Sequence, residues 1–325
     1  MSTSELHVIF GTGPLGKWTA RELVKMGCRV RMVNRSGKAQ DLPVEVELAH
    51  SDAYAAQKNI ELTRGATTIY QCAQPAYHEW AAKFPPLQQA ILEAAIANHA
   101  KFIAAENIYM YGDTQGALIT EETPNNAHTK KGQVRQAMTE AIFAAQSAGQ
   151  VRAAVVRGSD FFGPDDPIYA KLFFAPALQG KQVQMIGRLD VPHTFTYAPD
   201  FGKALALAGT RAEALGQIWH VPSDKALTQQ QLVDLMAEHV NKPVKVLVAS
   251  KLMVKALGLF VPALREIAEM FYEFDQPFVM ASSKFTSAFG VQPTSMSEAV
   301  RQTIKWNRAQ QIVHSAPKPK LAAAQ

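Results

Sequence analysis

The chain has 325 residues, of which 47% are hydrophobic and 19% are charged, a balance that is ordinary for a globular protein. Its formal net charge of +5 is modest and no long stripe of lysine and arginine occurs, so we expect no nucleic-acid partner. The two cysteines, Cys28 and Cys72, lack metal-ligand spacing and exclude a disulfide framework, so we expect no metal site and a reduced, cytoplasmic setting.

Neither a signal peptide nor a membrane span is predicted. The first apolar run begins at residue 6, which leaves no room for a signal peptide. The most apolar later stretch, residues 252–264, is interrupted by Lys255, Gly258 and Pro262, so we expect no membrane partner. Residues 316–325 are rich in proline, lysine and alanine, and we expect them to form a disordered tail.

The most informative segment is residues 6–35. An apolar run meets three closely spaced glycines, and a helix-like segment and a second apolar run follow. This order of strand, turn, helix and strand is typical of a dinucleotide-binding unit, in which the turn and the helix N-terminus bind the pyrophosphate. The predicted phosphate-binding turn consists of Gly11, Thr12, Gly13, Pro14, Leu15 and Gly16.

The residues after the second apolar run predict the type of cofactor. Asn34, Arg35 and Ser36 stand where NAD-preferring proteins usually carry an acidic residue. A carboxylate would repel a 2′-phosphate, whereas a guanidinium can bind it with two hydrogen bonds. The sequence therefore predicts that NADP(H) is preferred, with NAD(H) also allowed. The alternatives are a solvated surface arginine and a glycine-rich turn without a cofactor.

Strands and helices alternate through the rest of the first half. We expect strands at residues 45–48, 67–72, 101–105 and 152–156, and helices at 53–62, 78–98 and 129–148, with Pro85 and Pro86 able to break the second helix. Asp52 follows the third strand, near the expected adenine, and Ala73, Gln74 and Pro75 follow the fourth, at an edge where ligands bind. The pattern predicts an α/β fold with a doubly wound parallel sheet of Rossmann type.

The predicted NADP-binding domain covers residues 1–157, with returns around 190–222, and residues 158–315 form mainly a smaller C-terminal substrate lobe. In that lobe we expect a strand at 218–221 and helices at 227–239, capped by Thr228, 263–274 and 297–307. Large apolar side chains there either line an apolar or aromatic substrate cleft or form core: Phe161, Phe162, Phe173, Met270, Phe271, Tyr272 and Phe274. Candidate cations for an acidic substrate group are Arg135, Arg157 and Arg188.

Five motifs together resemble one known family. They are FGTGPLG at 10–16, YQCAQP at 70–75, FIAAENIYMYG at 102–112, VVRGSDFFGP at 155–164 and TFTYAPD at 194–200. Their order and spacing resemble an atypical extended short-chain dehydrogenase/reductase of the NAD-dependent epimerase/dehydratase type, although the family more usually has GxxGxxG in the first motif. The resemblance implies an oxidoreductase or epimerase-like enzyme for a small carbonyl, hydroxyl or enone substrate, and it allows a homodimer.

The expected active site departs from the family pattern. The family combines a Ser or Thr after the fifth strand with a Tyr-x-x-x-Lys pair on the next helix. Asn107 matches the Ser/Thr position, and Lys131 matches the lysine that binds the nicotinamide ribose, but Ala127 stands where the tyrosine is expected. The resemblance therefore leaves Tyr109, Tyr111 and His128 as candidates for proton transfer.

Two further readings of this region remain. Glu106 could serve as a general base if it is buried, or be a solvated loop carboxylate. Alternatively, catalysis has been lost and the protein is an NADP-binding sensor or scaffold.

Overall fold

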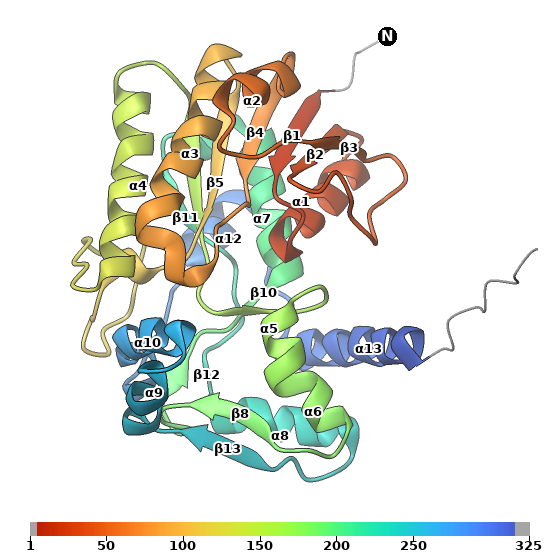
Figure 1. Cartoon of the computed structure of the whole chain (residues 1–325), viewed down its shortest axis with the longest axis vertical. Coiled ribbons are helices and arrows are strands. Elements are labelled where there is room, and N and C mark those ends of the chain that lie inside the picture. Colours follow the sequence, from red (N-terminus) through yellow and green to blue (C-terminus); the bar gives the residue numbers. More distant parts are fainter. Residues whose placement is uncertain (1–4, 316–325) are drawn as a thin grey trace, which may run out of the picture.

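The central sheet lies in the upper lobe of the molecule (Figure 1) and has seven parallel strands. In this computed structural model, which describes residues 5–315 except for the side chains at 262, 263 and 311–315, their order is β11-β6-β5-β4-β1-β2-β3. The order reverses direction between β1 and β4, so a crevice opens at the carboxyl ends of these two strands. The strands are β1 (Leu6–Phe10), β2 (Arg29–Asn34), β3 (Glu47–His50), β4 (Ala66–Gln71), β5 (Lys101–Glu106), β6 (Ala153–Arg157) and β11 (Ile218–His220).

Helices cover both faces of this sheet, as Figure 1 shows. On one face α2 (Ala56–Leu62), α3 (Trp80–Ala97) and α4 (Lys130–Ser147) form a core in which Ile91 and Ile142 pack with Phe102. On the other face α1 (Pro14–Lys25), α7 (Ala198–Thr210) and α12 (Ser283–Phe289) form a second core that includes Leu23 and Leu205. The predicted doubly wound α/β fold is therefore confirmed.

The lower lobe has its own core, in which Phe174, Leu232 and Val300 are buried. A parallel pair, β8 with β13, and several helices surround it (Figure 1). Its elements are β7 (Phe161–Phe162), α5 (Pro167–Tyr169), the π-helical η3 (Ala170–Phe174), α6 (Ala175–Leu178), β8 (Val183–Ile186), β9 (Pro192–His193), β10 (Thr196–Tyr197), β12 (Leu227–Thr228), α8 (Gln229–Val240), β13 (Val246–Ala249), α9 (Lys251–Gly258), α10 (Pro262–Glu269), α11 (Tyr272–Asp275) and α13 (Met296–Ser315). Short 3-10 turns are η1 (Tyr77–Glu79), η2 (Tyr109–Tyr111) and η4 (Ala212–Ala214).

Two expected helices differ from the observed ones. The prolines do not break α3, because the carbonyls that they leave without an N–H partner belong to Ala81 and Ala82, which are exposed to water. The single helix expected over 263–274 is two helices, because Met270 and Phe271 turn inward and are buried between α10 and α11. The predicted disordered tail lies outside the described residues.

Other expectations agree with the structure. Thr228 caps α8, and the side chain of Gln231 completes a capping box with it. Within residues 5–315, no helix is long and apolar enough to cross a membrane. Cys28 and Cys72 are free thiols.

An ionic contact joins the loop after β7 to α1 of the upper lobe. Asp165 lies 2.9 Å from the Lys17 ammonium and 2.7 Å from the Arg21 guanidinium, and its side chain is only 3% exposed. The Trp18 indole N–H donates to the Pro164 carbonyl at 3.1 Å beside this contact. Since α1 also begins at the glycine turn, the contact fixes the lower lobe relative to that turn.

We predict that Asp165→Asn destabilises the protein by about 1.5–3 kcal/mol, the range for hydrogen bonds to charged groups. Asparagine tolerates the left-handed backbone of residue 165, whose φ is 71°, so the change removes mainly the charge. Urea unfolding measures the loss. Asp190→Asn is the control, because Asp190 pairs with Arg188 at an exposed site, where an ion pair contributes little. Equal effects of the two variants would contradict the prediction.

Candidate active site

A cavity of about 670 Å³ lies between the lobes, at the carboxyl ends of the central strands. The glycine turn, the residues after β4 and β5, Gly158 and Ser159 after β6, and the start of η1 and α3 form its upper wall. Residues of α5, η3, β8, α10 and α11 form its lower wall. The cavity therefore occupies the place where ligands bind in open parallel α/β sheets.

Gly11 and Gly13 have different roles in the glycine turn. Gly11 has a φ of +108°, and a Cβ there would lie 2.6 Å from the Ala73 backbone nitrogen, so only glycine fits. A Cβ on Gly13 would meet nothing within 4 Å. Gly13 is the N-cap of α1 and makes no side-chain hydrogen bond, so the free N–H groups of the first turn remain available. The turn is thus a cradle into which a pyrophosphate fits.

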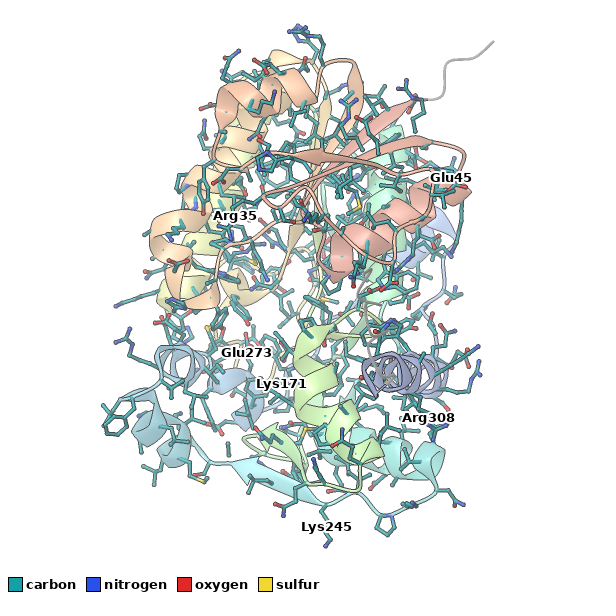
Figure 2. All side chains as sticks on the ribbon, turned by 45° about the vertical axis from the view of Figure 1, so that its right-hand side comes forward. Arg35, Glu45, Lys171, Lys245, Glu273 and Arg308 are labelled. Carbon is teal, nitrogen blue, oxygen red and sulfur yellow. The ribbon has the colours of Figure 1, made fainter. Side chains whose placement is uncertain are left out.

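The end of β2 is tied to this turn by Asn34. Its amide nitrogen donates to the Thr12 hydroxyl and to the Lys38 carbonyl, both at 2.8 Å, and its amide oxygen accepts from the Gly37 N–H at 2.7 Å. Arg35 and Ser36 remain exposed beside it, and Figure 2 shows Arg35 in the upper lobe. The loop therefore leaves the guanidinium of Arg35 accessible to a ligand.

The other predicted cofactor residues take several positions. Thr12, Pro14, Leu15, Ala73 and Gln74 line the cavity together with Gly11 and Gly13. Gly16 is buried beneath the turn, and a Cβ there would lie 2.1 Å from the Gly11 carbonyl oxygen. Asp52 is exposed and accepts a hydrogen bond from the Tyr54 N–H at 3.2 Å, and Pro75 is half-buried. Neither Asp52 nor Pro75 belongs to the cavity lining.

The four predicted catalytic residues do not converge on one point. Asn107 and Tyr109 line the cavity, and the Tyr77 hydroxyl donates to the Tyr109 hydroxyl at 3.4 Å. Lys131 is not part of the lining, because its ammonium pairs with Glu266 at 2.8 Å and donates to the Tyr77 carbonyl at 2.6 Å. His128 is exposed against the Tyr272 ring.

Tyr111 and Glu106 take part in buried networks. The Tyr111 hydroxyl bonds to the His220 imidazole at 2.7 Å. Glu106 lies 3.1 Å from Arg157 and 3.9 Å from Arg135, and the Thr139 hydroxyl donates to it. Because two guanidinium groups neutralise this carboxylate, its local role is to hold cations beside the cavity.

The sequence predicted Arg135 only as a candidate cation for an acidic substrate group. Arg135 follows Lys131 by four positions, and the Lys of the family's Tyr-x-x-x-Lys pair follows its Tyr by the same number. Counted in this way, Lys131 takes the place of the Tyr and Arg135 takes the place of the Lys. Arg135 is 2% exposed, donates to the Ala105 carbonyl at 3.1 Å and lines the cavity. Within the described residues it is the single Lys, Arg or His in that lining. Of the other two candidate cations, Arg157 is bound to Glu106 and Arg188 to Asp190.

The lower end of the cavity is acidic and aromatic. Asp160, Asp166 and Glu273 line it, and burial raises the pKa of Asp166 to about 6. The His193 imidazole lies 3.3 Å from the Asp160 carboxylate. The apolar candidates divide between the two expected roles, since Phe161, Phe173, Met270 and Phe274 line the cavity, whereas Phe162, Phe271 and Tyr272 do not.

Buried polar atoms without partners also belong to lining residues. Within residues 5–315 they include the Ser159 hydroxyl oxygen, Arg135 Nε, Trp80 Nε1 and Glu273 Oε1. Leaving such a group unsatisfied costs free energy, so folded proteins seldom keep one without a reason. A molecule bound in this cavity would supply partners for these four atoms.

The glycine turn generates a matched pair of predictions. We expect Gly13→Ala to leave the unfolding temperature unchanged but to weaken NADPH binding at least about tenfold, which corresponds to about 1.4 kcal/mol, because the methyl group enters the cradle. We expect Gly11→Ala to destabilise the fold by about 1–3 kcal/mol, the usual cost of a strained backbone position. Thermal unfolding and isothermal titration calorimetry separate the two effects. Loss of stability in Gly13→Ala would contradict this assignment.

Some known proteins resemble part of this chain, and others resemble nearly all of it. An uncharacterised protein of Sinorhizobium fredii is 26% identical over 119 residues, which are 36% of this chain and 33% of that protein. A dTDP-6-deoxy-L-talose 4-dehydrogenase (NAD(P)(+)) of Kitasatospora kifunensis is 24% identical over 75% of this chain and 81% of its own. The crystal structure of a UDP-glucose 4-epimerase of Thermotoga maritima, with UDP-glucose, has a TM-score of 0.77 at 17% identity and covers 94% of this chain and 99% of its own.

The family assignment follows from the sequence profile. The profile described as the NAD dependent epimerase/dehydratase family matches residues 8–221, which include the glycine turn, Asn107 and β11. The match agrees with the sheet order and with the place of the cavity. The chain belongs to the NAD dependent epimerase/dehydratase family and is an enzyme of the extended short-chain dehydrogenase/reductase type.

Proposed function

We propose that this enzyme uses NADP(H) to oxidise, reduce or epimerise a small, uncharged, apolar or aromatic compound with a carbonyl, hydroxyl or enone group. One observation carries the proposal: a single cavity joins the glycine turn, Asn107 and Arg135 to an aromatic and acidic end that contains no lysine or arginine within the described residues. The upper part suits a dinucleotide, and the lower part suits a substrate without negative charge.

The chain's own residues account for cofactor binding. The free N–H groups after Gly13 would hold the pyrophosphate, and Arg35 would hold the 2′-phosphate with its guanidinium. Asn107 and Arg135 would contact the nicotinamide half, because both line the cavity beyond the turn. When bound, the nicotinamide supplies or accepts the hydride.

The charge of the lining favours an uncharged substrate over a sugar nucleotide. Arg135 lies 3.9 Å from the opposing charge of Glu106, and two further acidic side chains, Asp160 and Asp166, belong to the same lining. A diphosphate needs cations or free N–H groups, and those at the turn would already hold the cofactor. The substrates that the names of the Kitasatospora and Thermotoga proteins indicate therefore do not suit this cavity.

A second candidate function is an NADP-binding sensor or scaffold without catalysis. The position of Lys131 favours it, because Glu266 and the Tyr77 carbonyl hold the ammonium outside the cavity lining. Both functions require the cofactor, and only the enzyme requires turnover.

The 2′-phosphate assignment is tested with Arg35→Ala. We expect this change to weaken NADPH binding by about 1–3 kcal/mol, the range for a charged hydrogen-bonded pair, and to leave NADH binding unchanged. Arg29→Ala is the matched control, since Arg29 is exposed at the opposite end of the same strand. Calorimetric titration with both nucleotides measures the difference. An equal loss for NADPH and NADH would contradict the assignment.

The substrate class is tested by following NADPH consumption with acetophenone and related neutral aromatic ketones and enones, and by following NADP⁺ reduction and UDP-galactose formation with UDP-glucose. We expect turnover of a neutral aromatic compound and none of UDP-glucose. Turnover of UDP-glucose would contradict the proposed class. If NADPH binds and none of the neutral compounds reacts, the sensor function is favoured.

A further inference from the structure

We propose that Glu273 is a catalytic residue of this enzyme: its carboxyl group hydrogen-bonds the substrate oxygen and carries the proton of the redox step. This inference rests on the proposed function and assigns the role that the family gives to the missing tyrosine to a residue of the lower lobe. Glu273 lies in α11, and Figure 2 shows it in the part of the lower lobe closest to the upper lobe.

Glu273 is buried in the wall of the cavity, where its carboxyl group is available to a bound ligand. The residue is 1% exposed and lines the cavity, and its Oε1 atom has no partner at hydrogen-bond geometry among the described side chains, although the carboxyl lies close enough to the Tyr272 hydroxyl to interact with it. Among the side chains that the structure describes, no lysine, arginine or histidine forms an ion pair with it, whereas the neighbouring Asp275 pairs with Lys251. A substrate oxygen that accepts a hydrogen bond would satisfy this buried carboxyl.

The backbone of Glu273 is held from both sides. Its N–H donates to the Met270 carbonyl at 3.1 Å, and its own carbonyl lies 3.2 Å from Nδ1 of His193, which comes from β9. The His193 ring also stacks on Phe274. These contacts fix the backbone segment that carries Glu273 in the cavity lining.

The surroundings of Glu273 favour the protonated form of its carboxyl. Burial, followed by the negative charge of Asp160, holds the pKa of Glu273 well above its usual range, and a contact with Tyr272 opposes them only in part. The titratable groups in this part of the molecule are Asp160, Asp166, Tyr77, Tyr109, Tyr169, Tyr272 and His193. Arg135, the cation of the lining, lies beside Glu106.

Burial raises the pKa of the carboxyl and of the nearby tyrosines, but from different starting points. It raises the pKa of Tyr77 and of Tyr109 further from neutrality. It raises the pKa of Glu273 well above its usual acidic range, and a carboxyl with a raised pKa can serve as a general acid. The carboxyl is therefore better suited than either phenol to exchange a proton during turnover.

The proposed step balances without another reactant. In a carbonyl reduction, the substrate carbon gains a hydride with its electron pair from the reduced cofactor as the C=O π bond breaks. The substrate oxygen gains a proton as the O–H bond of Glu273 breaks, which leaves a carboxylate. Water then restores the proton through the acidic end of the cavity, where the Asp160 side chain is 24% exposed. Oxidation of the alcohol follows the same path in reverse.

The protonated state is tested without cofactor or substrate. A carboxyl whose pKa is raised by folding stabilises the folded form below its unfolded pKa of about 4.3 and loses that contribution as the pH rises toward its folded value. We therefore expect the unfolding temperature of the wild type to fall relative to that of Glu273→Gln as the pH rises from 5 to 8, so that Glu273→Gln gains stability relative to the wild type. Asp275→Asn, an exposed position in the same helix, should show no such gain. A pH-independent difference for Glu273→Gln would overturn the proposal.

The catalytic role is tested on the ketone that reacts fastest in the substrate screen. We expect Glu273→Gln to lower kcat by about 10²–10⁴, the range for a general acid, while KM changes little because the amide still donates a hydrogen bond. NADPH affinity should match that of the wild type, and Asp275→Asn should keep full turnover. Full turnover by Glu273→Gln would overturn the proposal.

A binding measurement separates this inference from the proposed function. Saturation-transfer NMR measures the binding of acetophenone to three NADP⁺-loaded proteins, the wild type, Glu273→Gln and Glu273→Leu. We expect acetophenone to bind the wild type and Glu273→Gln, and to bind Glu273→Leu at least tenfold more weakly. Equal binding to all three, or none to the wild type, would overturn the Glu273 contact. If the wild type does not bind NADPH, the proposed function itself is overturned.

Discussion

The close approach of two backbone segments at the reversal of strand order is the constraint on which this structure depends. Gly11 lies against Ala73 so closely that no side chain fits between them, and α1 starts directly above. The N-terminus of α1 therefore opens into the crevice between β1 and β4. The Asp165 contact with Lys17 and Arg21 then sets the lower lobe against the same helix, so one element positions both halves of the cavity.

The distribution of charge divides that cavity into two environments. Free N–H groups, Asn107 and Arg135 lie at the sheet, where a dinucleotide would carry its negative charge. Carboxyl groups and aromatic rings lie at the lower end, where burial raises the pKa of Asp166 and Glu273. An anionic substrate would meet repulsion there, and a neutral compound would find apolar walls and hydrogen-bond donors.

Helix α4 illustrates what spacing alone can and cannot predict. Its span was predicted from periodicity, and its apolar residues Met138 and Ile142 are buried. The apolar Ala137 is exposed, whereas the charged Lys131 and Arg135 are buried. A charged residue is buried only where other segments neutralise it, here Glu266 from α10 and Glu106 from β5, and the helix sequence contains no information about those partners.

The sequence by itself determined the glycine turn, the alternation of strands and helices and the family, because these depend on local backbone preference and on hydrophobic periodicity. It also placed Asn107 beside the cavity through its position after β5. Only the tertiary structure decided which ionisable groups meet there. Glu273 lay within a stretch predicted as one continuous helix, and its place in the cavity lining depends on the burial of Met270 and Phe271 and on His193 from a distant strand. Burial and pairing are set by segments far apart in the chain, so no local pattern encodes them.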